Sequence, residues 1–402
     1  MFKSLSLKVI IFGFIFTFFS SFGQSFFLGL FNSSIRDALS ISHGQFGSIY
    51  ASATLLSSFI LIWLGKKIDD VNAIKFAFFV IISLSISSFL FSKINSIVFL
   101  FFAIFLMRLF GQGLMSHTAT TTVSRYFDKS RGKALSTAWL GLSSAEFLLP
   151  VAIVYLLTIL DWRDLWVSFS LLIILFLSVS SVFLIRKLDI NSRETENKKN
   201  ENENKIKQWK RSEVLKDYKF YIICGNLLAM PWIFTGFAVF QSFVQSSKEW
   251  GPYVIAQSFM AYSILSVITL FVTGFLIDKF TSRKLLIFTN IPLMLATLIL
   301  IFFDNPFSSF IFLGLMGITN GFANVLGSST WAELYGVKFI GGIKAMTSAL
   351  MVFSTAFGTA LFGFLIDKGF TIEQIASFSG FYILSMFVLL FLIKNKLKPQ
   401  YL

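Results

Sequence analysis

The sequence predicts an all-α membrane protein with twelve transmembrane helices in two six-helix pseudo-repeats. Only 13% of the 402 residues are charged and the mean hydropathy is +0.77, while apolar runs of about 20 residues recur along almost the whole chain. Similar motifs also return about 210 residues apart, which indicates an internal repeat. Because the apolar runs are continuous rather than alternating, the pattern does not fit a transmembrane β-barrel.

The first span is predicted within residues 1–31, where Lys3 and Lys8 are followed by roughly 22 apolar residues. This core is longer than that of a signal peptide, so we expect the helix to be retained. The other eleven spans are predicted near residues 44–64, 74–92, 97–119, 134–157, 165–185, 219–244, 253–276, 285–303, 309–330, 345–365 and 374–393.

Lysine and arginine are distributed unevenly between the connecting segments. If both termini are cytoplasmic, 28 of the 34 basic residues lie in cytoplasmic segments, five lie outside, and Arg108 lies within a span. This asymmetry predicts a multi-pass protein of the inner (plasma) membrane with both termini cytoplasmic. The net charge of +14 therefore reflects topology, and we expect no nucleic-acid partner.

Residues 186–218 are charged, rich in asparagine and poor in apolar side chains. This composition predicts a partly disordered cytoplasmic linker. It separates an N-terminal bundle at 1–185 from a C-terminal bundle at 219–402.

Two pairs of motifs carry the repeat. GKKIDD at 65–70 ends the second span and GFLIDK at 274–279 ends the eighth, while KALSTA at 133–138 and KAMTSA at 344–349 begin the fifth and eleventh. Because both pairs have nearly the same offset, the halves are predicted to be parallel repeats. Transporters built in this way bind substrate near the membrane midplane, between halves that expose it alternately to each side.

Two ionisable residues fall inside predicted spans. Arg108 and Glu146 each lie about twelve residues from the basic loop that joins spans 4 and 5, so both are expected near mid-membrane. A charge at that depth is costly and usually marks a site or pathway. Gln112 shares the helix face of Arg108. We expect Glu146 to exchange a proton and Arg108 to hold either Glu146 or an anionic substrate group; the alternative is a permanent salt bridge between the two spans.

The second half has no counterpart to these charges, since the repeat aligns Glu146 with Phe357 and Arg108 with about Thr319. Neutral polar side chains are therefore candidates for completing a substrate site, although such groups also join helices to one another. The substrate-binding candidates are Ser20, Gln24, Gln241, Asn320, Asn324 and Ser354.

Other classes of chemistry have no support in the sequence. The single cysteine, Cys224, excludes an intramolecular disulfide, and His43 and His117 have no partners at metal-ligand spacing. No nucleophile–base pair or phosphate-binding loop is evident. We therefore expect no enzymatic activity, no catalytic residue, no metal and no cofactor.

The motifs resemble those of the major facilitator superfamily over essentially the full chain. That family carries G-x-x-x-D-(R/K)-x-G-(R/K)-(R/K) after its second span, often echoed after its eighth, and R-x-x-x-Q-G in its fourth. The fourth-span motif matches Arg108, Gln112 and Gly113. The loop motifs are degenerate, because Asp70 replaces the expected base in the first copy and both copies lack the second glycine.

The resemblance implies a cytoplasmic latch that favours the outward-open state, with the two aspartates accepting hydrogen bonds from helix N-termini or nearby bases. Ordinary capping of loops is the alternative. The expected latch residues are Gly65, Asp69, Arg125, Arg131, Gly274, Asp278, Lys279 and Arg283.

These observations predict a proton-coupled secondary transporter of a small polar solute, for which one basic residue at mid-depth favours an organic anion such as a monocarboxylate. The chain has some features of the monocarboxylate and oxalate–formate branch, without that branch's basic residues in spans 8 and 11. Its expected partners are a small-molecule substrate, protons and the lipid bilayer, and we expect a monomer. The alternatives are proton-driven efflux of cationic or amphipathic compounds, uptake of a neutral sugar or zwitterion, and a non-transporting membrane receptor.

Overall fold

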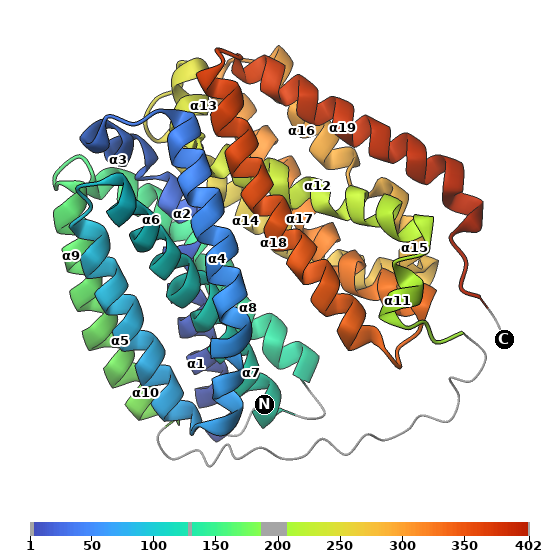
Figure 1. The fold of residues 1–402 in the computed structure, drawn as a ribbon, viewed down its shortest axis with the longest axis horizontal. Coiled ribbons are helices and arrows are strands. Elements are labelled where there is room, and N and C mark those ends of the chain that lie inside the picture. Colours follow the sequence, from blue (N-terminus) through green and yellow to red (C-terminus); the bar gives the residue numbers. More distant parts are fainter. Residues whose placement is uncertain (1–3, 128–130, 186–206, 401–402) are drawn as a thin grey trace. The chain divides into compact units, whose positions relative to one another are not determined.

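The computed structural model describes residues 4–127, 131–185 and 207–400, and these residues form helices and connecting loops without a β-strand (Figure 1). Twelve of the helical segments are long and apolar enough to cross a membrane. Each one coincides with a predicted span, so the predicted fold class is confirmed. Several spans extend beyond the predicted ends, as at His43–Ile68 and Pro306–Tyr335, whereas the seventh, predicted to reach residue 244, ends at Val239.

The described residues divide into two compact units. Unit 1 contains the described residues up to 185 together with the short segment Ala238–Ser242. Its elements are α1 (Ser4–Ser20), η1 (Ser21–Gly23), α2 (Ser25–Gly29), α3 (Asn32–Leu39), α4 (His43–Asp70), α5 (Ala73–Ser92), α6 (Ile97–Leu106), η2 (Met107–Met115), α7 (Ser116–Tyr126), α8 (Arg131–Leu156), α9 (Trp162–Leu172), η3 (Ile173–Leu177) and α10 (Ser178–Ile185).

Unit 2 contains the remaining described residues from 207 onward. Residues 186–206 of the predicted linker lie outside the described part of the chain. The elements are α11 (Arg211–Val214), α12 (Tyr218–Val239), α13 (Gln241–Ser247), α14 (Val254–Phe280), α15 (Ser282–Leu285), η5 (Leu286–Phe288), α16 (Ile291–Phe302), α17 (Pro306–Tyr335), α18 (Ile340–Asp367), α19 (Ile372–Ile393) and η6 (Lys394–Lys396).

Polar capping residues set the starts of several spanning helices. Ser42 and Gln45 form a capping box at the start of α4, and Thr371 and Gln374 form another at the start of α19. The Asn305 side chain accepts from the Ser308 N–H at the start of α17. Because the first backbone N–H groups of a helix lack helical partners, these side chains determine the residue at which each helix begins.

Small residues bring α1 and α8 into direct backbone contact. A Cβ atom at Gly13 would lie 2.9 Å from the Cβ of Ala138, and one at Gly141 would overlap the carbonyl oxygen of Phe14. The Thr17 hydroxyl donates to the Ala138 carbonyl oxygen at 2.5 Å. Helices in a membrane associate through such close packing and hydrogen bonds, because lipid provides no hydrophobic drive between them.

Unit 2 joins α12 to α18 in the same way. A Cβ atom at Gly358 would overlap the carbonyl oxygen of Trp232, and the Ser354 hydroxyl donates to the Leu228 carbonyl oxygen at 3.0 Å. These helices are the first and fifth spans of their half, as α1 and α8 are of theirs. The recurrence of one packing device at matching positions agrees with the predicted pseudo-repeat.

Three spans of unit 1 are irregular where the sequence predicts continuous helices. The sixth contains the short π-helix η3. The first span ends its regular helix at Ser20, and Gln24 is extended (φ −82°, ψ 153°) before α2 begins. In the fourth span, η2 is a nine-residue π-helix between α6 and α7. Breaks at membrane depth are tolerated only where protein groups or water satisfy the freed backbone, and π-helical turns often occur at functional sites.

Candidate functional site

Arg108 lies in η2 and is buried, with 4% of its surface exposed. Its Nη1 donates to the carbonyl oxygen of Gly23 at 3.0 Å. Its guanidinium carbon lies 5.4 Å from the centre of the Tyr50 ring, and the Tyr50 hydroxyl lies 3.1 Å from the Ser25 Oγ. Arg108 therefore connects the break of the first span to the fourth span, with a tyrosine of the second span against the cation.

Two glycines allow this contact. A Cβ atom at Gly111 would lie 2.7 Å from the backbone nitrogen of Gly23, and one at Gly23 would overlap backbone atoms of Met107 and Gln112. The two irregular elements η1 and η2 thus meet backbone to backbone. A larger residue at either position would separate them and withdraw the Gly23 carbonyl from Arg108.

Glu146 lies in α8 and has 9% of its surface exposed. No ion pair joins it to Arg108, and no described residue donates a hydrogen bond to its carboxyl group. Since Gly141 lies opposite Phe14 on the parallel helix α1, Glu146 is level with about residue 19, within about 6 Å of the depth of Gly23. The two ionisable groups therefore lie at similar depths, and the salt-bridge alternative does not hold in this structure.

The other polar candidates of unit 1 differ in what they contact. The Gln24 and Gln112 side chains are half-buried and form no hydrogen bond with a described residue. Ser20 is fully buried and donates to the Thr17 carbonyl oxygen at 2.7 Å. Gln241 is buried and donates to the carbonyl oxygens of Phe26 and Ala238, at 2.9 Å and 3.0 Å, which holds the segment Ala238–Ser242 in unit 1.

The candidates of unit 2 form mainly helix-to-helix contacts. Asn320 donates to the Ser266 hydroxyl at 2.9 Å, which joins α17 to α14, and Ser354 joins α18 to α12. Asn324, one turn beyond Asn320, is exposed and has no described hydrogen-bond partner. Residues four apart share a helix face, but these two asparagines have different environments.

The residues expected to form a latch in the first half are only partly described. Arg125 donates to the carbonyl oxygen of Ile68 at 2.9 Å and so caps the last turn of α4. The Nε2 of His117 lies 3.0 Å from the carbonyl oxygen of the buried Gly65. The side chains of Asp69 and Arg131 lie outside the described part of the chain.

In the second half, Glu333 accepts the hydrogen bonds from a helix N-terminus that were expected for Asp278. Asp278 and Lys279 are exposed, and Asp278 accepts no hydrogen bond from a described residue. The carboxylate of Glu333, in the last turn of α17, accepts instead from the backbone N–H groups of Ser282 at 2.8 Å and Arg283 at 3.3 Å.

Gly274 does not lie at a close helix contact, because no atom lies within 4 Å of a Cβ built there. An acidic residue near the end of a span was the sequence signal that could have identified Glu333.

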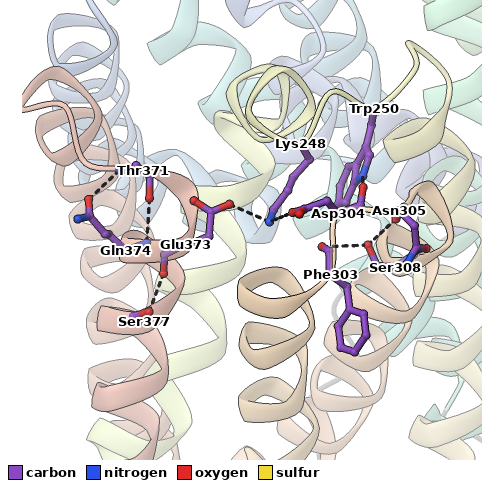
Figure 2. Close-up of polar contacts among 10 residues, drawn as sticks. All are labelled: Lys248, Trp250, Phe303, Asp304, Asn305, Ser308, Thr371, Glu373, Gln374 and Ser377. Carbon is purple, nitrogen blue, oxygen red and sulfur yellow. Dashed lines mark hydrogen bonds and ion pairs between the residues drawn. The ribbon is translucent and has the colours of Figure 1, made fainter.

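Outside the spans, Lys248 forms a cluster that the sequence gives no reason to single out (Figure 2). Its Nζ lies 2.5 Å from Asp304 Oδ1 and 2.8 Å from Glu373 Oε1, and only 1% of its side chain is exposed. The indole N–H of Trp250 donates to the Asp304 carbonyl oxygen at 2.6 Å. Burial disfavours the charge, but the hydrogen bonds with Asp304 and Glu373 outweigh it and raise the pKa of Lys248 above its usual value.

Metal-binding residues do not cluster in the part of the chain that is described, where no three His, Cys, Asp or Glu side chains could hold one ion.

Comparisons with known proteins match this architecture. The sequence model of the Major Facilitator Superfamily matches residues 13–256 and 221–400. The crystal structure of the nucleoside transporter NupG aligns with a TM-score of 0.67 and 14% identity, covering 97% of this chain and 99% of that chain. A single-residue mutant of NupG gives a TM-score of 0.69 and 15% identity, covering 97% and 100%.

A bacterial homolog of the human lysosomal transporter Spinster, in an inward-facing and occupied conformation, aligns with a TM-score of 0.67 and 13% identity, covering 98% of this chain and 95% of that chain. At these identities the likeness shows the fold. No curated protein sequence matches the chain. With the family model matching nearly its full length, the chain belongs to the major facilitator superfamily and is a multi-pass secondary transporter with twelve membrane-spanning segments.

Proposed function

We propose that the chain transports a small organic anion, such as a monocarboxylate, together with protons across the inner membrane, with both termini cytoplasmic. The observation that carries this proposal is the unused donor capacity of Arg108. One hydrogen bond to the Gly23 carbonyl oxygen accounts for Nη1, while the buried Nε has no described partner. A guanidinium has five N–H donors in a fork that matches a carboxylate.

An anion would also relieve the electrostatic penalty at this position. A buried charge without a counter-ion is expensive in a membrane protein. Because no ion pair joins Arg108 to Glu146, the substrate itself would supply the negative charge. In this proposal the half-buried amides of Gln24 and Gln112 complete the anion site in unit 1, and Asn324 is the candidate that remains in unit 2.

Glu146 is the proposed proton carrier. Its carboxyl group is buried at the depth of the Arg108 contact and has no counter-ion among the described residues. It can therefore gain or lose a proton without breaking an ion pair. Proton exchange at Glu146 and anion binding at Arg108 would then be separate steps of one cycle, coupled through the packing of α8 against α1.

The cytoplasmic latch belongs to the same proposal. The bond from Arg125 to the Ile68 carbonyl oxygen lies one residue from Asp69, and Glu333 caps α15 in the second half. We infer that these contacts stabilise the cytoplasmic ends of the spans in the outward-open state. The monocarboxylate branch is a narrower proposal, which depends on the identity of the anion.

Transport in proteoliposomes tests the proposal. Purified protein would be reconstituted with an inward proton gradient and supplied with radiolabelled lactate, pyruvate or acetate. We expect accumulation that collapses with a protonophore. The Glu146→Gln variant is expected to keep counterflow exchange but to lose gradient-driven accumulation, and the Arg108→Gln variant to lose both. Gradient-driven accumulation that is unchanged in Glu146→Gln would refute the proton role.

A second candidate, proton-driven efflux of cationic compounds, is favoured by the same unpaired Glu146. A buried carboxylate that no arginine neutralises can also attract an organic cation. The proteoliposome assay separates the two functions. An exporter of cations would move a labelled cation such as tetraphenylphosphonium out in exchange for protons and would not transport lactate. In that case Arg108→Gln would retain transport.

A further inference from the structure

The end of the predicted linker is folded onto one end of unit 2. The backbone N–H of Lys207 donates to the Gln400 carbonyl oxygen at 2.8 Å, and that of Trp209 donates to the Tyr335 carbonyl oxygen at 3.0 Å. The Gln208 side chain accepts from the Lys338 N–H at 2.9 Å. Residues 207–217 are therefore fixed against the C-terminal end of α17 and the end of the chain, where α11 lies (Figure 1).

A buried core holds this segment in place. Val214 is fully buried and packs with Trp331, Tyr335 and Leu397. Leu397 follows η6 directly, so the segment after α19 joins the same cluster. The linker end and the C-terminal segment thus form one ordered surface at the end of unit 2 where α12 begins and α19 ends.

The acidic groups of this surface are already used within the protein. Glu213 accepts from the Lys210 N–H at 2.7 Å and pairs with the Lys207 ammonium at 3.3 Å, and these contacts hold the pKa of Glu213 below its usual value. Asp217 accepts from the Tyr335 hydroxyl at 3.1 Å and pairs with Lys219 at 3.5 Å.

The cations of the surface, in contrast, point outward. We call the following five exposed side chains the basic surface: Lys210, Arg211, Lys216, Lys396 and Lys398. Four of the five make no ion pair with a described residue, and Lys210 interacts only with the already paired Glu213. The segments 207–219 and 394–400 together contain no other acidic residue, so their charge is strongly positive.

Exposed apolar and aromatic side chains border the basic surface. Leu215 is 41% exposed, and Tyr218 and Tyr221, in the first turn of α12, are 50% and 56% exposed. Tyrosine rings at the ends of spans lie at the level of the lipid headgroups. The basic surface is thereby held beside the headgroup region and not out in the solvent.

We propose that the basic surface binds the headgroups of anionic phospholipids in the adjacent leaflet and so anchors this end of unit 2 to the membrane. Basic segments next to a span attract anionic lipids with about 1 kcal/mol for each Lys or Arg near the surface, which is about a fivefold gain in affinity. Because the cations are presented by an ordered segment, their spacing is fixed before the lipid binds. The proposal does not depend on the identity of the transported substrate.

A lipid titration of the full chain tests this. Purified protein in neutral detergent would be titrated with dioctanoyl phosphatidylglycerol or dioctanoyl phosphatidylcholine while its melting temperature is followed. We expect a saturable rise with phosphatidylglycerol, weakened by salt, and little response to phosphatidylcholine. Replacing Lys210, Arg211 and Lys216 with glutamine is expected to raise the half-saturating concentration about 100-fold.

A matched variant separates this surface from general cationic charge. Lys66, Lys67 and Lys75 are also exposed and lie on the side of the membrane predicted to be cytoplasmic, but in unit 1. Their triple replacement with glutamine is expected to leave the titration unchanged. The charge-retaining pair Lys210→Arg and Lys216→Arg is expected to behave as wild type. An equal shift in the unit 1 variant, or an equal response to phosphatidylcholine, would overturn the proposal.

Discussion

The guanidinium of Arg108 donates a hydrogen bond to the carbonyl oxygen of Gly23 at 3.0 Å. That carbonyl is freed because the first span breaks at Gln24, and the donor lies in the π-helical part of the fourth span. A charged donor thus satisfies a buried backbone acceptor that has no helical partner. The residue that we propose as the anion anchor also supports an irregular stretch of backbone, so anion binding and the shape of the first span are physically connected.

The contact between Gly23 and Gly111 predicts strong sensitivity to added volume. Gly23→Ala and Gly111→Ala would each insert a methyl group into backbone atoms, and overpacking of this kind costs about 1–3 kcal/mol. We expect each variant to melt at a lower temperature in detergent than wild type. Gly327→Ala is the matched control, because nothing lies within 4 Å of a Cβ there and alanine favours a helix. A control that loses as much stability would contradict this reading.

Tyr50 is expected to tune the affinity of the Arg108 site. Tyr50→Phe keeps the ring beside the guanidinium and loses only the hydroxyl contact with Ser25, whereas Tyr50→Leu also loses the cation–π interaction. Since that interaction contributes about 0.5–2 kcal/mol, we expect counterflow KM to rise about 2- to 30-fold in the leucine variant and less in the phenylalanine variant. Equal KM values in both variants would show that the ring does not act on Arg108.

Glu333 and Asp278 are expected to contribute differently to stability. Glu333→Ala removes the acceptor for two backbone N–H groups at the start of α15, and loss of such a cap costs about 0.5–2 kcal/mol. Asp278→Ala removes an exposed side chain that has no described partner, so its effect is expected to be small. Thermal unfolding of the two variants side by side measures the difference. A larger loss of stability in Asp278→Ala than in Glu333→Ala would show that Asp278 is the capping group.

The Lys248 cluster predicts a specific dependence of stability on pH. The pKa of Lys248 is raised in the folded state, so its charge stabilises unit 2 fully below the pKa of an unfolded lysine, about 10.4, and this contribution is lost as the pH rises through the folded pKa. We expect the melting-temperature difference between wild type and Lys248→Met to be constant from about pH 7 to 9 and to shrink at higher pH.

Glu373→Gln provides the comparison for this experiment, because it removes one partner of the same ammonium group while Asp304 remains. We expect it to lower the melting temperature at neutral pH and to reduce the difference between neutral and alkaline conditions. A wild-type advantage over Lys248→Met that persists unchanged at the highest pH would show that the ammonium charge is not what stabilises the cluster.

The spans and the depth of the two buried charges followed from the sequence, because apolar length and charge placement are local properties. The break at Gln24 did not, since phenylalanine-rich stretches lie on both sides of it and suggest one continuous span. It depends on the backbone of Gly111, more than 80 residues away in the sequence. The same applies to Lys248, whose partners Asp304 and Glu373 belong to other loops and helices.

The family motif points to the loop after the eighth span, but the carboxylate that caps α15 there belongs to Glu333 and not to Asp278. A degenerate motif fixes which loop is involved, while the choice between Asp278 and Glu333 depends on where the end of α17 lies relative to α15. For the substrate candidates, the presence of a polar residue within a span did not show whether its side chain binds a neighbouring helix. The side chains of Ser354, Gln241 and Asn320 donate hydrogen bonds to neighbouring helices. No pattern along the chain distinguishes these residues from Gln24 or Gln112.

The glycine and alanine contacts between α1 and α8 leave these helices no room to slide. With Gly13 against Ala138 and Gly141 against Phe14, a displacement of even one residue along the axis would drive side chains into backbone. The pair is therefore a rigid reference body within unit 1. Because the chain has one cysteine, the buried Cys224, spin labels could be placed at chosen positions on α1 and α8 after a single replacement. The distance between these two labels is expected to stay constant. Labels on the other helices of the unit could then be measured against α1 and α8.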